Sequence, residues 1–140
     1  MLTNFKFNPA NTIMQDPKCF KGTCELWTLE YSFSRAGFPM IVYTWKYKDT
    51  LFKDYRSVKT DQMKEREIQY LGLLCNKCGE DPQQFIEIIK PETLDELLLG
   101  MCQIITNQCR FTCEIERKLR NGSTFYDVIV NTNTVAKVQQ

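Results

Sequence analysis

The feature that most constrains the fold is a set of three β-type runs in the N-terminal half, separated by turn signals. Aromatic and β-branched residues, which favour strands, dominate 23–34 and 40–48. Between these runs, 35–39 (Arg-Ala-Gly-Phe-Pro) is a turn signal. Asp49-Thr50 marks a second turn, and a weaker run follows over 51–60. The pattern therefore predicts three consecutive strands.

The second of these runs alternates with a period of two, so its two sets of side chains point to opposite faces of a sheet. One set contains Met40, Val42, Thr44, Lys46 and Lys48. The other set is more aromatic and is predicted to face the core; it contains Ile41, Tyr43, Trp45 and Tyr47.

Helical signals follow the third run. Thr60-Asp61 is suited to cap a helix, apolar residues then recur at three- to four-residue spacing, and Gly79 supplies a stop. This predicts one principal helix over about 61–78. A short helical segment is predicted over 82–89. Thr93 and Glu96 form a capping-box pattern for another short helix, which Gly100 is predicted to end.

Two further strands are predicted near the C-terminus. Apolar residues alternate with polar ones over 109–116, and Asn121-Gly122 is a strong hairpin signal before a last strand over 123–131. The chain is predicted to be one domain over 1–140, as its length suggests. Within that domain, residues 1–21 are expected to be an irregular arm, 22–131 a barrel and 132–140 a loose tail.

The order of these elements predicts a mainly β fold with one principal helix between the third and fourth strands. That order is typical of the OB-fold, a five-stranded Greek-key barrel. The same elements are also compatible with other α+β arrangements.

Composition excludes several classes of function. The chain contains no histidine, which removes His-based acid–base catalysis, Ser-His and Cys-His nucleophile pairs, and metal sites that require imidazole. The carboxylates form no catalytic pair, and no glycine-rich phosphate loop is present. No long apolar run predicts a membrane span, and the first residues do not resemble a secretory signal. The sequence therefore predicts a non-enzymatic protein that does not bind membranes.

Seven cysteines are expected to be reduced thiols in an intracellular setting. Cys75 and Cys78 have the spacing of a metal knuckle, and a second pair, Cys19/Cys24 or Cys109/Cys113, would complete a four-thiolate zinc site. A redox motif is less favoured, because this CxxC pair ends a helix and does not begin one. We expect all seven thiols to be unliganded, with no cofactor and no metal, and zinc binding stays an alternative.

Charge and aromatic residues are unevenly distributed, although the net charge is only +1. Residues 35–59 carry six basic and two acidic side chains, whereas 61–100 carry four basic and nine acidic ones. Nine of the 17 aromatic residues fall in 27–55. Stacking platforms for bases and cations for phosphates are what a single-strand nucleic-acid-binding protein requires. Filling of a core by the same aromatic residues is the competing interpretation.

The order and spacing of several short motifs resemble those of compact phage-encoded single-stranded-DNA-binding proteins. The resemblance spans residues from about 4 to 131. It rests on Asn4-Phe5-Lys6-Phe7, Gly22, Gly37-Phe38-Pro39-Met40-Ile41, Thr60, the Leu-rich stretch 71–79, Leu94-Asp95-Glu96-Leu97 with Gly100, and Asn121-Gly122.

This resemblance implies an OB-fold protein that coats single-stranded DNA during phage replication or recombination, in the cytoplasm of an infected bacterial host. Replication or recombination proteins would be its partners, and its oligomeric state is left open. From the distribution of aromatic and basic residues, the nucleic-acid-binding residues are predicted on the first three strands and at the start of the turn after the first. They are Tyr31, Phe33, Arg35, Lys46, Lys48, Lys53, Tyr55, Arg56 and Lys59. A protein–protein adaptor or inhibitor built on a small α+β domain is the main alternative, and a zinc protein with four cysteine ligands is the second.

Overall fold

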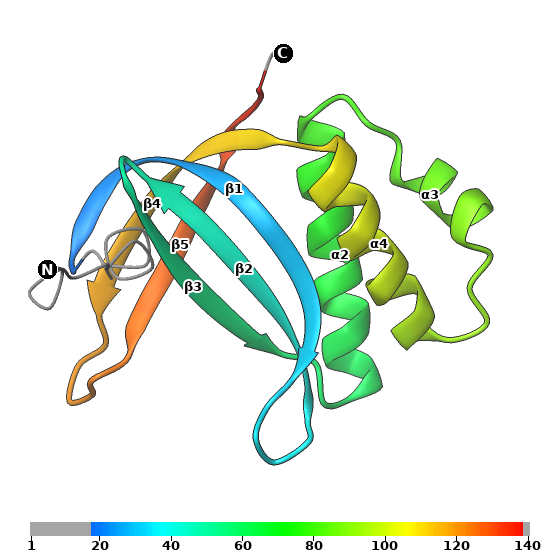
Figure 1. Cartoon of the computed structure of the whole chain (residues 1–140), viewed down its shortest axis with the longest axis horizontal. Coiled ribbons are helices and arrows are strands. Elements are labelled where there is room, and N and C mark those ends of the chain that lie inside the picture. The colour runs from blue at the N-terminus through cyan, green and yellow to red at the C-terminus, as the bar shows by residue number, and fades with distance from the viewer. Residues whose placement is uncertain (1–17, 139–140) are drawn as a thin grey trace, which may run out of the picture.

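The computed structural model of the chain describes residues 18–138, so most of the predicted N-terminal arm lies outside the described residues. Three strands come first, three helices follow, and two strands end the described chain (Figure 1). In order, the elements are β1 (Phe20–Phe33), β2 (Pro39–Tyr47), β3 (Thr50–Ser57), α2 (Asp61–Lys77), α3 (Pro82–Ile89), α4 (Leu94–Gln108), β4 (Phe111–Leu119) and β5 (Tyr126–Lys137).

All five strands pair antiparallel in one sheet of order β3-β2-β1-β4-β5. The long strand β1 lies in the middle of the sheet and joins its two halves, because its first part pairs with β4 and its second part pairs with β2. A bulge between Leu26 and Thr28 lies where β1 passes from one partner to the other. Among residues 18–138 no pairing joins β3 to β5, so the sheet is open and these two strands are its edges.

The helices gather on one side of the curved sheet (Figure 1). α4 packs against β1 and α2, and α3 covers the outside of α4. The predicted helix over 61–78 is confirmed within one residue, with the Thr60 hydroxyl accepting a hydrogen bond from the Met63 amide at 3.1 Å. The prediction of one principal helix was incomplete, since α4 is nearly as long as α2.

Gly100 does not end a helix, contrary to the prediction, and α4 continues through it to Gln108. Thr93 does cap this helix, because its hydroxyl accepts from the Glu96 amide at 3.1 Å. The reason for glycine at position 100 is space, since an added Cβ would lie 2.6 Å from side-chain carbons of Ile89. Gly100 therefore lets α3 pack closely on α4.

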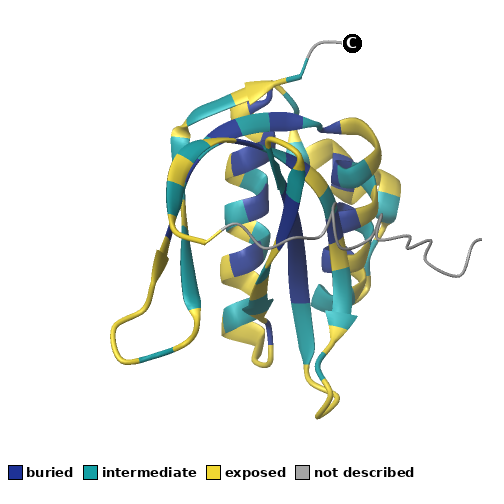
Figure 2. Cartoon of the chain, turned by 60° about the vertical axis from the view of Figure 1, so that its left-hand side comes forward, coloured by how far each residue is buried: buried dark blue, intermediate teal, exposed yellow. Residues whose placement is uncertain are grey.

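The core lies between the helices and the sheet face that they cover (Figure 2). Ile41, Tyr43 and Trp45 of β2 are buried in it, as their alternation predicted. Val42 and Thr44 on the opposite face are also buried. β2 is paired on both sides, so Val42 lies between Glu30 and Tyr55, and Thr44 lies between Thr28 and Lys53.

The C-terminal part differs from the prediction of a loose tail after residue 131. β5 begins three residues later than predicted and continues to Lys137, paired with β4 as far as Phe111. The Glu114 amide donates to the Thr134 hydroxyl at 2.7 Å, which fixes this polar stretch against β4. Likewise, residues 20 and 21, assigned to the irregular arm, begin β1. Backbone pairing supplies order here without any apolar pattern.

None of the helices within residues 18–138 is long and apolar enough to cross a membrane.

Candidate nucleic-acid interface

The strand register divides the predicted binding residues between the two faces of the sheet. Residues directly opposite in an antiparallel pair lie on the same face. Tyr55 is opposite Val42, which is opposite Glu30, and this row faces away from the helices. Arg56 is opposite Ile41, which is opposite Tyr31, and this row faces the core and the helices. Tyr31 and Arg56 therefore do not share a face with Tyr55.

Tyr31 links the sheet to the helical layer. Its hydroxyl donates to Asp95 of α4 at 2.6 Å, and Lys64 of α2 lies 3.1 Å from the same carboxylate. Desolvation, reinforced by the hydrogen bond to Asp95, raises the pKa of Tyr31 to about 12. Phe33 rests edge-on against the Tyr31 ring, with 5.5 Å between centroids, and is 59% exposed. Tyr31 is thus a packing residue, and Phe33 is exposed beside it.

Arg56 is held in a partly buried network of aromatic rings and carboxylates. Its guanidinium carbon lies 4.9 Å and 4.4 Å from the ring centroids of Tyr43 and Tyr70. Its Nε lies 3.2 Å from Asp54, and Nη1 lies 3.8 Å from Glu67 of α2. Burial raises the pKa of both carboxyl groups, and Arg56 opposes that shift. Arg56 therefore ties β3 to α2. Its side chain points to the opposite face of β3 from that of Lys53, although both residues line the cleft described below.

The cations predicted at strand ends lie at opposite ends of the sheet. Arg35 is in the exposed β1–β2 loop, and Lys59 lies at the same end, with Nζ 4.2 Å from the Phe38 ring centroid. Lys48 occupies the β2–β3 turn with a φ of 54°, and its Nζ lies 5.3 Å from the Tyr47 ring. These residues do not form one groove along β2 and β3.

Lys46 and Lys53 lie on the sheet face that points away from the helices. Lys46 Nζ is 4.8 Å from the ring centroid of Trp27, a residue at the β1 bulge. Arg110 lies 4.9 Å from the same ring and forms an ion pair with Glu25 at 3.0 Å. The indole is 39% exposed between these groups. Lys53 is exposed on the edge strand β3, two residues before Tyr55 and therefore on the same face.

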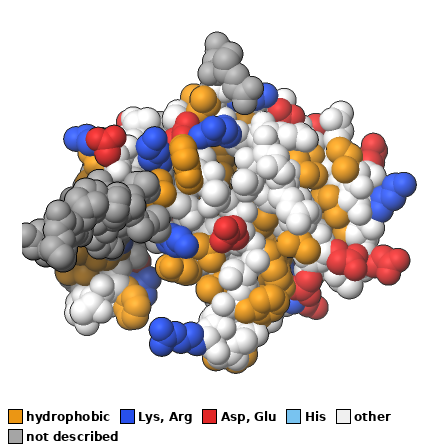
Figure 3. Space-filling view, in the orientation of Figure 1, with side chains coloured by type: hydrophobic (Ala, Val, Ile, Leu, Met, Phe, Trp, Pro, Cys, Tyr) orange, Lys and Arg blue, Asp and Glu red, His pale blue; other side chains and the backbone are white. Residues whose placement is uncertain are grey.

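An open cleft of about 1180 Å³ lies between the two edge strands, and exposed aromatic side chains line it on both sides. Figure 3 shows the surface hollowed between β3 and the β4–β5 hairpin. Tyr55 lines the β3 wall and is 60% exposed, and Phe125 lines the hairpin wall and is 69% exposed. Between them, Arg117 of β4 lies 5.3 Å from the Phe52 ring and 4.1 Å from the Tyr126 ring.

The charged groups of this cleft are predominantly cationic. Lys53 and Arg56 line it from β3, Arg117 lines it from β4, and Arg120 lines it from the hairpin. Two carboxylates oppose them: Asp54, which is engaged with Arg56, and Asp127, which lies 2.7 Å from Arg120. A strand of nucleic acid here would meet aromatic faces and cations together, which is the combination that single-strand binding uses.

Sequence reasoning missed the hairpin side of this cleft. It identified Asn121-Gly122 as a turn, and Gly122 indeed has a φ of 69°. The residues that flank the turn, Arg120 and Phe125, are a cation and an aromatic side chain at the tip of a hairpin. A cation and an aromatic residue beside a predicted turn could have indicated a binding site in the sequence. Only the fold shows that they lie across the cleft from Tyr55.

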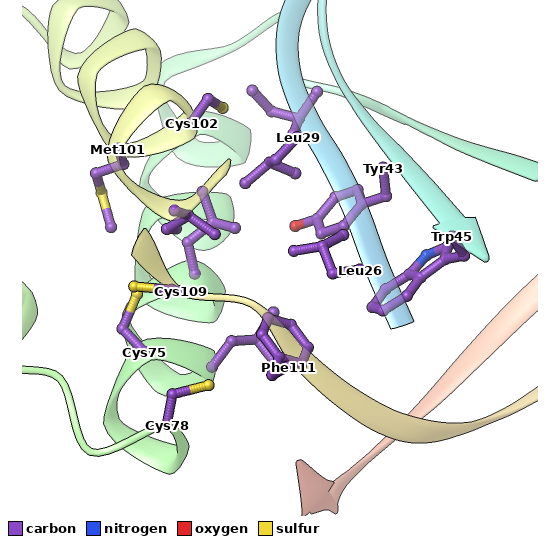
Figure 4. Close-up of a cluster of buried hydrophobic side chains, with 14 of the residues drawn as sticks. Leu26, Leu29, Tyr43, Trp45, Cys75, Cys78, Met101, Cys102, Cys109 and Phe111 are labelled. Carbon is purple, nitrogen blue, oxygen red and sulfur yellow. The ribbon is translucent and has the colours of Figure 1, made fainter. Parts of the chain in front are cut away.

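The cysteines are mostly part of the core (Figure 4). All seven lie within the described residues and are free thiols. The side chains of Cys75 and Cys109 point toward each other, and the Cys75 thiol donates a hydrogen bond that lowers the pKa of Cys109. Cys24 and Cys113 are cross-strand neighbours, and Cys19 is exposed. Among residues 18–138, no three Cys, Asp or Glu side chains are arranged to hold a metal ion.

Comparison of the chain with protein-family models, with curated proteins and with solved structures finds no match in any of the three.

Proposed function

We propose that this protein binds single-stranded DNA without sequence preference and coats it by equilibrium binding. The proposal includes an OB-type barrel whose seam is the gap between β3 and β5. The strand order supports it, because β1 pairs with both β2 and β4 and leaves β3 and β5 facing each other across a cleft. The setting that the sequence resemblance implies is phage replication or recombination, with no catalytic activity.

The observation that carries this proposal is the pair of exposed aromatic residues on opposite walls of the cleft. Tyr55 and Phe125 leave 60% and 69% of their surface open to solvent, although both line a concave site. Burying aromatic surface of this size on binding is favourable, and every base offers a flat face for stacking. Sequence-independent contact with unpaired bases follows from that geometry.

Lys53 and Arg120 supply the electrostatic part of the proposed interface. Both belong to the walls that carry the exposed aromatic rings. Arg120 is 61% exposed beside Asp127, so its guanidinium is accessible to a phosphate. A duplex would present its bases already paired and stacked, and the aromatic residues of the cleft would then gain nothing from it. We therefore expect a preference for single strands.

Fluorescence anisotropy with labelled oligo-dT, oligo-rU and duplex DNA tests the proposal. A series of oligonucleotides from about 4 to 16 nucleotides identifies the shortest strand that binds, and that length limits the assay to one protein per strand. We expect tight binding to oligo-dT and much weaker binding to duplex. Tyr55→Ala and Phe125→Ala should each weaken binding by about 5- to 150-fold, because stacking contributes about 1–3 kcal/mol per base.

The matched control for these variants is Phe33→Ala. Phe33 has nearly the same exposure as Tyr55 but lies beside Tyr31, outside the cleft. Its replacement should leave the affinity for oligo-dT unchanged. If Phe33→Ala weakened binding as much as Tyr55→Ala or Phe125→Ala does, the lost affinity would reflect a general effect on the protein and would contradict binding in the cleft. Absence of any binding at low salt would refute the single-strand proposal outright.

Salt dependence separates the cations from the aromatic residues. Each phosphate contact on a single strand contributes about 0.7 to the slope of log affinity against log salt. Lys53→Ala should reduce that slope by about this amount, whereas Tyr55→Ala should lower affinity and leave the slope unchanged. Lys59→Ala is the control, because Lys59 lies at the β1–β2 loop, away from the cleft.

A protein–protein adaptor is the second candidate, and the edges of β3 and β5 favour it. Within residues 18–138 neither edge is paired on the side that faces the cleft. An extended peptide can add to such an edge through backbone hydrogen bonds. If the protein binds none of the three nucleic acids in the anisotropy assay, the adaptor becomes the favoured function.

A further inference from the structure

The two layers of the protein carry opposite net charge. The helical segment 61–100 has nine acidic and four basic side chains, a balance of −5. The rest of the described chain has seven acidic and thirteen basic side chains, a balance of +6. Because the helices lie together on one side of the sheet, this difference in sequence becomes an electrical polarity of the folded molecule.

The acidic layer exposes large apolar side chains. Ile88 of α3 is 69% exposed and Leu99 of α4 is 45% exposed. The exposed carboxylates Glu87, Glu92 and Glu96 belong to the same two helices and the turn between them, where Lys90 is a single exposed cation. In Figure 3 this part of the molecule shows hydrophobic side chains among acidic ones. We name this region, with Glu87, Ile88, Glu92, Glu96 and Leu99, the α3–α4 surface.

The β1–β2 loop has the opposite charge and also exposes large apolar side chains. Phe33 and Phe38 are 59% and 46% exposed, and Arg35 and Lys59 lie with them at this end of the sheet. The loop is well formed, with backbone bonds of 2.8 Å from the Ser34 amide to the Phe38 carbonyl and 2.9 Å from the Gly37 amide to the Ser34 carbonyl. Its exposed rings are therefore held in place by the backbone.

We propose that these two surfaces bind each other between copies of this chain. Each combines exposed apolar groups with charges that are mostly of one sign, with Lys90 as the exception beside the α3–α4 surface. The prevailing signs are opposite, so the surfaces are complementary in both respects. Figure 1 places the loop at the lower end of the sheet and α3 on the far side of the helices, so the contact does not form within one molecule. The occupant of each surface is thus a second copy.

The contact is head-to-tail, because two different surfaces meet. A head-to-tail contact leaves one free surface of each kind at the ends of every assembly, and it extends into a row or closes into a ring. Two identical surfaces related by a two-fold axis would instead stop at a dimer. This inference stands without the nucleic-acid proposal, since it rests on surfaces outside the cleft and is tested without DNA.

Sedimentation velocity of the full chain over a range of protein concentrations tests it first. At low salt the average mass should rise steadily with concentration, with no plateau at the dimer. In about 1 M salt, where the Debye length falls from about 10 Å to about 3 Å, the protein should return to the monomer. A wild-type protein that stays monomeric at every concentration at low salt would overturn the proposal.

A mixing experiment tests the head-to-tail geometry. The loop variant carries Arg35→Glu and Phe38→Ser, and the helix variant carries Glu87→Lys and Ile88→Ser. All four positions are exposed, so both variants should fold, and far-UV circular dichroism checks this. Each variant alone should be monomeric. Their equimolar mixture should form a 1:1 heterodimer, because each contributes the surface that the other lacks.

Leu119→Ser is the control, because Leu119 is 49% exposed at the end of β4 and belongs to neither surface. It should associate like the wild type. Equal loss of association in this control would show that any exposed apolar residue contributes, which contradicts the proposal. A folded loop or helix variant that still associates alone, or a mixture that stays monomeric, would also refute it.

Discussion

Replacing Gly100 by alanine should destabilise the protein, although alanine favours a helix over glycine by about 1 kcal/mol. A Cβ at this position would lie 2.6 Å from Cδ1 and Cγ1 of Ile89 and 2.8 Å from Cγ2. Carbon atoms in favourable contact are separated by about 3.5–4.0 Å. Three atoms of one β-branched side chain crowd the same point, so a change of rotamer does not relieve the clash and α3 must move away from α4.

Gly72 of α2 provides the matched comparison. It also lies inside a helix, but its added Cβ would be 3.6 Å from Pro82 Cγ, which is an ordinary contact. Gly72→Ala should therefore gain up to about 1 kcal/mol of stability from helix propensity alone. Overpacking typically costs about 1–3 kcal/mol, so Gly100→Ala should be less stable than Gly72→Ala by about that amount.

Urea unfolding followed by far-UV circular dichroism measures both free energies of unfolding. The same pair of variants in an Ile89→Ala background completes a double-mutant cycle, and there the difference should shrink, because the clashing atoms are gone. The reasoning is refuted if Gly100→Ala is as stable as Gly72→Ala, or if removing the Ile89 side chain leaves their difference unchanged.

Three other perturbations have clear expected outcomes. Gly22→Ala would place a Cβ 2.7 Å from Cε1 of Tyr47, and urea unfolding should show a loss of about 1 kcal/mol. Thr60→Ala removes the oxygen that accepts from the Met63 amide, and the same assay should show a loss of about 0.5–2 kcal/mol. Burial raises the pKa of Glu67, so the folded protein holds this proton more tightly than the unfolded chain does. The stability gained from this proton is fully present below about pH 4 and is lost as the pH rises through the folded-state pKa of Glu67. The Glu67→Gln variant has no ionisable group at this position. The melting temperature of wild type should therefore fall relative to that of the variant over the same rise in pH.

The order of the elements could be predicted from the sequence because each signal is local. Thr60 caps α2, Gly79 with a φ of 80° ends it, and Gly122 with a φ of 69° forms the hairpin turn. Each of these depends on a few neighbouring residues and on the conformations that their side chains allow. The alternation of Ile41, Tyr43 and Trp45 identified the core face of β2 for the same reason.

Gly100 and the end of β5 could not be predicted in this way, because the cause of each is distant in sequence. Glycine stops a helix only where it adopts a positive φ, and at position 100 it makes room for Ile89 instead. The stretch after residue 131 has no apolar period, yet β4 offers it an edge to pair with. Such partners become visible only when the chain is folded.

The candidate site was only partly predictable, because alternation within one strand does not reveal how that strand is placed against the next. Tyr31, Phe33 and Tyr55 were expected on one face, but a bulge at 26–28 shifts β1, and the register puts Tyr31 on the core side. The hairpin contribution of Phe125 was missed because β4 and β5 follow the helices in sequence and face β3 only across the open edge of the sheet.

The alternation of β3 explains why its outer residues suit the proposed interface. Asp54 and Arg56 share the inner face of β3, and Arg56 contacts both Asp54 and Glu67 of α2. These contacts hold the edge strand, which has a sheet neighbour on one side only among the described residues. Successive side chains of a strand point to opposite faces, so fixing this inner pair also orients Lys53 and Tyr55 outward. Arg56 therefore contributes to the proposed interface as a positioning residue. An open edge can present a preformed aromatic surface because a partly buried ion network, and not a second strand, holds it in place.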